Sequence, residues 1–141
     1  MTYEEALQKI NSRLRFGIKP GLERIEALLK ELDNPQDKFK SVHVTGTNGK
    51  GSVSSMIANI LLAGNLKTGK FISPHLVKYN ERISINNNDI TDEAFALVIS
   101  AVKQAADSIV AKGVCEQPTQ FEVLTLSLIH ISEPTRHLRI S

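Results

Sequence analysis

The stretch that most constrains this chain of 141 residues covers positions 41–52 and reads S-V-H-V-T-G-T-N-G-K-G-S. A short β-branched run enters a glycine-rich turn, and apolar residues then recur at helical spacing from Val53 onward. A strand, such a turn and a helix N-terminus form a phosphate cradle, because backbone N–H groups and the helix dipole both favour negative charge there. Lys50 adds a full positive charge, and Ser52 offers an oxygen to a magnesium ion. The pattern therefore predicts a nucleotide-binding turn and disfavours an ordinary glycine turn with a solvated lysine.

Apolar residues at helical spacing predict five helices. Thr2 with Glu5, and Thr119 with Glu122, have the T-x-x-E spacing of a capping box at a helix start. The expected helices run from Thr2 to about Arg13, from Leu22 to Leu32, from the phosphate turn to Ala63, from Thr91 to Gly113, and from Thr119 onward.

Short β-branched or aromatic segments predict the strands. Ser41–Val44 and Lys70–Ile72 are separated by a helix, so they should pair in parallel. Residues 82–90 should form a hairpin that turns at Asn86–Asn88, because Asn tolerates positive φ. Strands that alternate with crossover helices predict an α/β domain with three layers and a mainly parallel sheet.

Composition limits the partners of the chain. Hydrophobic residues make up 41% of it and the net charge is +2, with acids and bases interspersed, so neither a nucleic-acid tract nor a membrane patch is indicated. No apolar stretch approaches the roughly 20 residues that span a bilayer, and the polar start after Met1 is unlike a secretory signal. The single Cys115 cannot form an internal disulfide. We expect a cytoplasmic protein with small-molecule partners that is monomeric at full length.

Three further stretches accompany the phosphate turn. They read F-G-I-K-P-G-L-E-R-I at 16–25, S-P-H-L-V-K-Y-N-E-R-I at 73–83 and P-T-Q-F-E at 118–122. The turn resembles that of the Mur ligase superfamily, and the S-P-H-L and G-L-E-R stretches resemble its folylpolyglutamate synthase / dihydrofolate synthase family. The resemblance covers roughly residues 1–125 and implies a truncated, P-loop-containing central domain of the Mur ligase type.

This resemblance implies a site for ATP and Mg²⁺. The residues matching the ATP-binding turn are Thr47, Asn48, Gly49, Lys50, Gly51 and Ser52. Lys50 would take the catalytic role of offsetting charge on the transferred phosphoryl group. The metal ligands would be Ser52 and Ser73, although a hydroxyl at position 73 also suits a turn before Pro74.

The resemblance also implies substrate contacts to a pteroate group at two helix starts. The matching residues are Lys19, Pro20, Gly21 and Leu22, and Thr119, Gln120, Phe121 and Glu122. From the residues alone, Thr119 and Glu122 read as a plain capping box, and Lys19-Pro20 departs from the acidic–apolar pair of some relatives. His75 is open between a ligand contact and a turn contact, and His43 is interpreted as a core histidine.

The implied reaction is ATP-dependent joining of L-glutamate to dihydropteroate or a folate through an acyl phosphate. The alternatives are a Mur-type cell-wall amino-acid ligase and a non-catalytic nucleotide-binding module. Further metal ligands and the glutamate-binding domain of this family follow the matched region, so the 141 residues alone are expected to lack ligase activity.

The last residues depart from the family pattern. Residues 126–141 resemble a translated sequencing adapter and carry no evident helical stripe, so we expect a family segment over 1–125 and a non-native tail over 126–141. His130 and His137 lie in this tail and receive no functional role.

Overall fold

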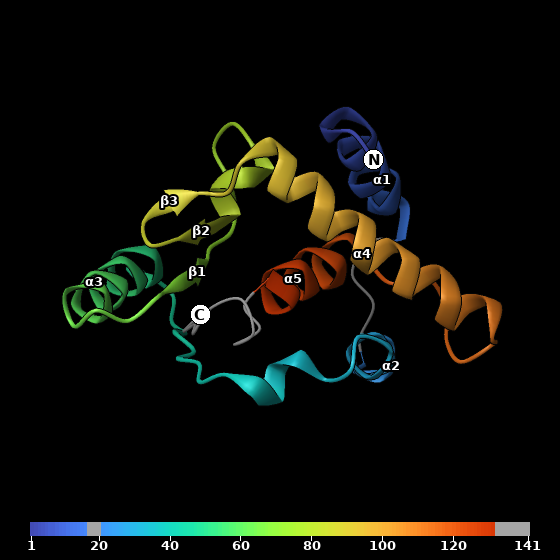
Figure 1. The fold of residues 1–141 in the computed structure, drawn as a ribbon, viewed down its shortest axis with the longest axis horizontal. Helices are drawn as coiled ribbons and strands as arrows, with labels where there is room; N and C mark the ends of the chain where they lie inside the picture. Colours follow the sequence, from blue (N-terminus) through green and yellow to red (C-terminus); the bar gives the residue numbers. More distant parts are fainter. Residues whose placement is uncertain (17–20, 132–141) are drawn as a thin grey trace.

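A computed structural model describes residues 1–16 and 21–131 of the chain (Figure 1). In the described part, the α-helices are α1 (Tyr3–Ser12), α2 (Glu23–Glu31), α3 (Lys50–Ala63), α4 (Asp92–Ala111) and α5 (Gln120–Ile131). The strands are β1 (Gly69–Phe71), β2 (Ile83–Ile85) and β3 (Asn88–Asp89), and short 3-10 turns are η1 (Arg13–Phe16), η2 (Pro35–Lys38) and η3 (Tyr79–Arg82).

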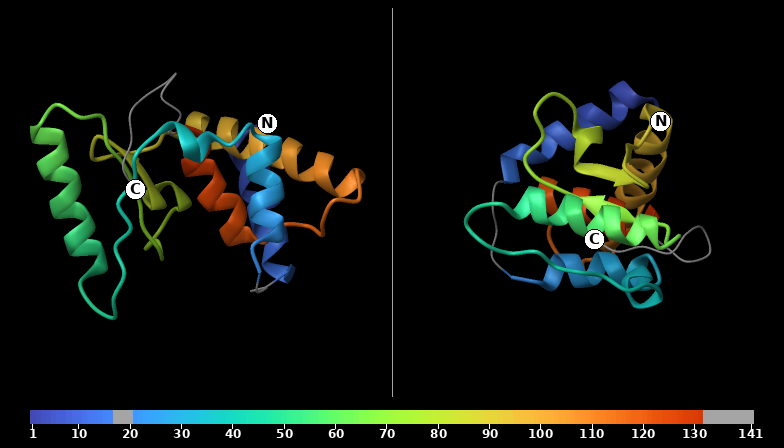
Figure 2. Two further views of the ribbon diagram at one scale, coloured as in Figure 1. Left: turned by 90° about the horizontal axis from the view of Figure 1, so that it is seen from below. Right: turned by 90° about the vertical axis from the view of Figure 1, so that its left-hand side faces the viewer.

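The small sheet separates α3 from the other helices. Figure 1 and the turned view in Figure 2 both place α3 on one side of the strands and α1, α2, α4 and α5 on the other. Lys70 on β1 donates a hydrogen bond to the Ser55 hydroxyl on α3 at 3.0 Å, which ties the phosphate-turn helix to the sheet.

The predicted helix starts and the hairpin are confirmed. The Thr2 hydroxyl accepts from the Glu5 amide at 3.1 Å, and the Glu5 carboxylate accepts from the Thr2 amide at 2.7 Å. The Thr91 hydroxyl accepts from the Ala94 amide at 3.1 Å and caps α4. Asn86 and Asn87 have φ of 52° and 65°, the left-handed values that a tight turn between β2 and β3 requires.

The prediction of a mainly parallel sheet is not confirmed. β1 pairs antiparallel with β2, which pairs antiparallel with β3. The expected strand Ser41–Val44 is wrong for the described structure, since no backbone hydrogen bond joins residues 41–48 to another described residue. Val42 and Val44 still lie beside α3 and β1. The β-branched pattern therefore predicted correctly that this segment lies next to α3 and β1, but the predicted hydrogen bonding to a neighbouring strand is not found.

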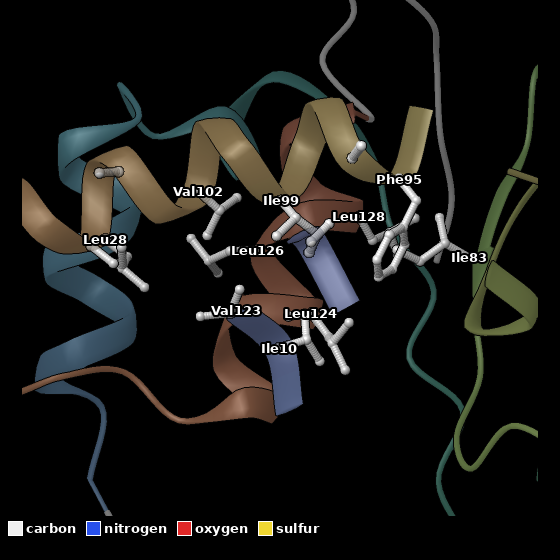
Figure 3. Packing of buried hydrophobic residues seen from close by; sticks show 14 of the residues in the cluster. Ile10, Leu28, Ile83, Phe95, Ile99, Val102, Val123, Leu124, Leu126 and Leu128 are labelled. Atoms are coloured by element: carbon white, nitrogen blue, oxygen red, sulfur yellow. The ribbon is translucent and has the colours of Figure 1, made fainter. Parts of the chain in front are cut away.

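The core lies between α1, α2, α4 and α5 (Figure 3). The figure labels Ile10, Leu28, Ile83, Phe95, Ile99, Val102, Val123, Leu124, Leu126 and Leu128, all buried. Helical spacing puts residues 123 and 126, and residues 124 and 128, on adjoining parts of one face of α5. The expectation that no helical stripe continues after residue 125 is therefore wrong for residues 126–128, and α5 itself continues to Ile131.

The expectation that no apolar stretch approaches the length of a membrane span is wrong for α4, the longest described helix. By length and composition α4 is apolar enough to cross a membrane, so the sequence does contain one stretch of about that length. Phe95, Ile99, Val102 and Ile109 of α4 are buried in the protein core. These contacts explain the apolar composition of α4 as that of a central core helix.

Candidate functional site

A cleft of about 410 Å³ opens where the phosphate turn meets the end of β1 and one side of α5. Lys50 and Gly51 line it from the start of α3, and Ser73 lines it from the chain that leaves β1. Phe121 and Thr125 line it from α5. The structure therefore brings together Lys50, Ser73 and Phe121, which the sequence analysis assigned to nucleotide, metal and substrate and of which the first and last are 71 positions apart.

The phosphate turn has the backbone conformation that its glycines predict. Gly46 has φ of 151° and Gly49 has φ of 75°, and Gly49 is the N-cap residue of α3. A Cβ atom added at Gly51 would meet no atom of residues 1–16 or 21–131 within 4 Å. Packing among these described residues therefore does not require glycine at position 51, while close approach of a phosphate to the backbone would.

The side chains of the turn are open to solvent. Residues 47–52 are all exposed, and Lys50 occupies the first position of α3 with its charge near the cleft. Ser52 lies exposed on the same first turn, next to Gly51. The N-cap residue Gly49 provides no side-chain hydrogen bond to the first amides of α3.

A carboxylate organises the segment after Ser73. Glu81 accepts hydrogen bonds from the backbone amides of Leu76, Val77 and Lys78 at 2.9, 2.9 and 2.7 Å. The bond from Lys78, followed by those from Leu76 and Val77, lowers the pKa of the Glu81 carboxyl from its ordinary value. The segment that leads away from the cleft is thus held by one charged side chain.

This contact predicts a pH dependence for the segment. Because the folded pKa of Glu81 is lowered, its stabilising contribution is fully present above the unfolded value of about 4.3 and is lost as pH falls through the lower folded value. In an NMR pH titration, the amide shifts of Leu76, Val77 and Lys78 should change with a common midpoint below that of the urea-unfolded chain. Glu81→Gln should remove this transition. A midpoint equal to or above the unfolded one would contradict the assignment.

An aromatic pair forms the apolar wall of the cleft. The rings of Phe71 on β1 and Phe121 on α5 meet edge to face at 6.0 Å between centroids, and both residues line the cleft. Phe121 keeps 54% of its surface exposed, so one side of its ring remains open to a ligand. A flat aromatic ligand would find stacking area here, beside the charged mouth formed by Lys50.

The other residues predicted at the start of α5 make contacts within the protein. The Glu122 carboxylate accepts from the Thr119 amide at 2.9 Å and from Arg24 Nε at 3.0 Å. The Glu122 amide donates to the Thr119 hydroxyl at 3.3 Å, which completes the capping box. Gln120 Nε2 donates to the Tyr79 hydroxyl at 2.6 Å. The cap interpretation of Thr119 and Glu122 is therefore confirmed, and the side chain of Gln120 is already bonded within the chain.

Of the residues predicted before α2, the two that the structure describes do not line this cleft. Gly21, with φ of 107°, and the exposed Leu22 line no part of it. Lys19 and Pro20 lie outside the described residues.

The structure corrects the prediction for His43 and distinguishes between the two interpretations of His75. His43 is exposed and lines the cleft, so its interpretation as a core histidine is wrong. The misplacement follows from the missing strand, because an unpaired segment leaves its side chains open. His75 Nδ1 accepts from Arg82 Nε at 2.8 Å, and its ring lies 4.3 Å from that of Tyr79. These are contacts within the segment, as the turn interpretation of His75 predicts.

Other catalytic chemistry finds little support in the described residues. Among residues 1–16 and 21–131, no three His, Cys, Asp or Glu side chains lie together as metal ligands. Burial raises the pKa of the Cys115 thiol, which keeps it protonated and a poor nucleophile at neutral pH. The cleft therefore offers a cation, hydroxyls and backbone amides, which suit phosphate better than they suit covalent catalysis.

Comparison with known proteins agrees with this geometry. No family model matches the chain. The chain is 38% identical over 123 residues to a dihydrofolate synthase/folylpolyglutamate synthase of Bacillus subtilis, a match that covers 87% of this chain and 28% of the relative. The chain thus spans a little over a quarter of the length of that curated relative.

Solved structures show the same fold. The apo form of the Lactobacillus casei folylpolyglutamate synthase superposes with a TM-score of 0.90 at 32% identity, over 100% of this chain and 35% of that one. A folylpolyglutamate synthase complex with AMPPCP and folate gives 0.86 at 30% identity, over 100% of this chain and 35% of that one. By sequence similarity and by fold, the chain matches a part of proteins of the folylpolyglutamate synthase/dihydrofolate synthase family.

Proposed function

We propose that this chain forms the nucleotide-binding side of an ATP-dependent ligase that joins L-glutamate to dihydropteroate or to a folate. The observation that carries the proposal is the single cleft that brings Lys50, Ser73 and Phe121 together. A positive charge and a helix N-terminus at one end suit a triphosphate, and an exposed ring at the other suits a pterin or benzoyl group. The named relatives, and the complex with AMPPCP and folate, support this pairing of ligands.

The phosphate turn would hold the nucleotide. Backbone amides from Thr47 to Ser52, with Asn48 and the two glycines between them, would surround the β- and γ-phosphates. Lys50 would offset the negative charge that spreads over the transferred phosphoryl group, which is the main requirement in this kind of transfer. Exposure of every residue of the turn leaves the amides open to such a ligand.

The hydroxyls of Ser52 and Ser73 fit a magnesium ion as a minor part of its ligand set. Ser73 and Lys50 line the same cleft, and Ser52 lies on the same first turn of α3 as Lys50. Mg²⁺ ordinarily keeps several waters and binds phosphate oxygens, so two hydroxyls are a sufficient contribution from this segment. When bound, the ion would neutralise phosphate charge and orient the γ-phosphate.

The chemistry of the proposed reaction requires a dry, oriented carboxylate. An oxygen of the pteroate carboxylate would attack the γ-phosphorus, the bond from that phosphorus to the β,γ-bridging oxygen would break, and ADP would leave. The amine of glutamate would then attack the acyl carbon and release phosphate, with one proton lost from the nitrogen. The wall formed by Phe71 and Phe121 would hold the aromatic part of the substrate and exclude water from the acyl phosphate.

The proposal extends to how this chain behaves by itself. Because it spans 28% of its Bacillus relative, we infer that glutamate binding depends on residues which that relative carries outside the matched region. We place the protein in the cytoplasm, with small molecules as its ligands.

Calorimetric titration tests the ligand assignment. The 141-residue chain should bind MgATP, and then dihydropteroate more tightly with MgATP present than without it. An assay of labelled glutamate incorporation should show no product. Binding of a UDP-linked sugar in place of dihydropteroate would indicate a Mur-type ligase, and ATP binding that dihydropteroate does not affect would indicate a nucleotide-binding module. Ligation by this chain alone would contradict the inference that its glutamate site is incomplete.

A further inference from the structure

We propose that Tyr79 is a positioning residue that fixes the distance between the Ser73 side and the Phe121 side of the cleft. The inference rests on the proposed function, because it assigns Tyr79 a role in how that cleft holds the pteroate ligand. Tyr79 does not line the cleft and touches no reacting atom. It acts through the two segments that it joins.

The hydroxyl of Tyr79 is bonded on both sides. It donates to Asn11 Oδ1 on α1 at 3.0 Å and accepts from Gln120 Nε2 on α5 at 2.6 Å. Gln120 is the residue immediately before Phe121, whose ring forms the apolar wall. Through one oxygen atom, the segment after Ser73 is therefore connected to the helical turn that carries the wall.

The ring of Tyr79 is held as firmly as its hydroxyl. It lies 4.3 Å from the His75 ring, and it stacks on Phe95 of α4 at 6.3 Å with 24° between the planes. The Arg82 guanidinium lies 5.4 Å from the ring centre while its Nε donates to His75. These contacts fix the ring against the core, so the hydroxyl cannot follow Gln120 if the start of α5 shifts.

The polar link has a mechanical consequence. Ser73 lies six residues before Tyr79, and the Glu81 contacts with three successive amides stiffen the chain between them. A ring at Phe121 and a hydroxyl at Ser73 can hold the two ends of one ligand only if their separation is fixed. The bond between Tyr79 and Gln120 supplies a direct side-chain connection between those two walls.

A second tyrosine provides a matched control. The Tyr3 hydroxyl on α1 donates to Asn80 Oδ1 at 2.8 Å, and the Tyr3 ring also contacts Phe95, at 5.5 Å. Tyr3 is thus a part-buried tyrosine that bonds to η3, as Tyr79 belongs to η3, but no bond recorded for its hydroxyl reaches α5. Loss of either hydroxyl removes a tertiary hydrogen bond, while only Tyr79→Phe removes a side-chain hydrogen bond to Gln120 at the start of α5.

The experiment compares Tyr79→Phe, Tyr3→Phe, Gln120→Met and the Tyr79→Phe/Gln120→Met double variant in the 141-residue chain. Calorimetry measures the Kd of MgATP, and then the Kd of dihydropteroate at saturating MgATP. The apparent Kd is independent of stability as long as nearly all molecules are folded, which circular dichroism of each variant checks. Tyr79→Phe and Gln120→Met should each weaken dihydropteroate binding roughly five- to tenfold, the scale of one lost hydrogen bond, with MgATP affinity within about twofold of wild type.

The double variant and the control decide the outcome. If the two side chains act through their mutual bond, the double variant should lose no more than the single ones, and Tyr3→Phe should bind both ligands like wild type. Unchanged dihydropteroate binding by Tyr79→Phe would overturn the inference while the proposed function stands. A loss in Gln120→Met without one in Tyr79→Phe would also overturn it, since Gln120 would then contact the ligand itself. Failure of the wild-type chain to bind dihydropteroate would instead refute the proposed function.

Discussion

Replacing Arg24 with methionine should destabilise the protein by about 3–5 kcal/mol, the usual effect of removing one member of a buried ion pair. Arg24 on α2 and Glu122 on α5 keep only 7% and 9% of their surfaces exposed, and Arg24 Nε lies 3.0 Å from Glu122 Oε1. Without the guanidinium, the Glu122 carboxylate would remain buried with the Thr119 amide as its other recorded donor. Urea unfolding followed by circular dichroism measures the change in the free energy of unfolding.

A surface ion pair that also begins on α2 serves as the comparison. Lys112 Nζ lies 3.3 Å from Glu31 Oε1, and both side chains are open to water, so Lys112→Met should cost less than about 1 kcal/mol. The double variant Arg24→Met/Glu122→Leu should regain much of the stability lost in Arg24→Met, because no buried charge is left alone. Equal losses for Arg24→Met and Lys112→Met would contradict the structural role given to the buried pair.

The buried pair also shows a contact of Glu122 that the sequence could not reveal. A carboxylate at a helix start beside an aromatic ring is a reasonable ligand contact, and sequence spacing could reveal only its local alternative, the capping box with Thr119. The ion pair with Arg24 joins positions 98 apart along the chain, and local spacing carries no information about such a contact. Its effect is that Phe121 is presented to the cleft by a firmly held helix start, while Glu122 itself faces the protein.

Local chemistry was the part of the fold that sequence could predict. The caps at Thr2 and Thr91, the hairpin at Asn86 and Asn87, and the glycine turn before α3 depend on neighbouring residues, and all are found. The pairing of β1 with β2 depends on which distant strand is available, and two short β-branched runs cannot specify that. The position of His43 in the cleft could not be predicted for the same reason. Side chains alternate between buried and exposed along a paired strand, but an unpaired segment has no such alternation from which the exposure of His43 could be predicted.

In the candidate site too, the sequence predicts features that depend on neighbouring residues and not those that depend on distant ones. Lys50, Gly51 and Ser73 could be selected because each lies at a strand or helix end with a recognisable turn, and the structure places all three in one cleft. The network around Tyr79 could not be predicted from the sequence, because it connects α1, η3, α4 and α5 through side chains with no common spacing. Sequence therefore selected three residues that share one cleft and missed the side chains whose contacts connect the walls of that cleft.

The central claim is that the turn from Gly46 to Ser52 binds the phosphates of MgATP. Lys50 carries the only full charge within that turn, and a hydrogen bond to a charged group contributes about 1.5–3 kcal/mol. Lys50→Ala should therefore weaken MgATP binding roughly 10- to 100-fold. Added salt should reduce this difference, because the contact is exposed and electrostatic.

Calorimetric titration of MgATP into the wild-type chain, Lys50→Ala and Lys67→Ala is the most direct measurement. Lys67 is an exposed lysine on the connection from α3 to β1 and lines no part of the cleft, so its removal changes net charge equally without touching the turn. We expect the wild-type chain and Lys67→Ala to bind MgATP with similar affinity, and the loss to be confined to Lys50→Ala. Equal MgATP affinity in all three proteins, or no binding by the wild-type chain, would contradict the central claim.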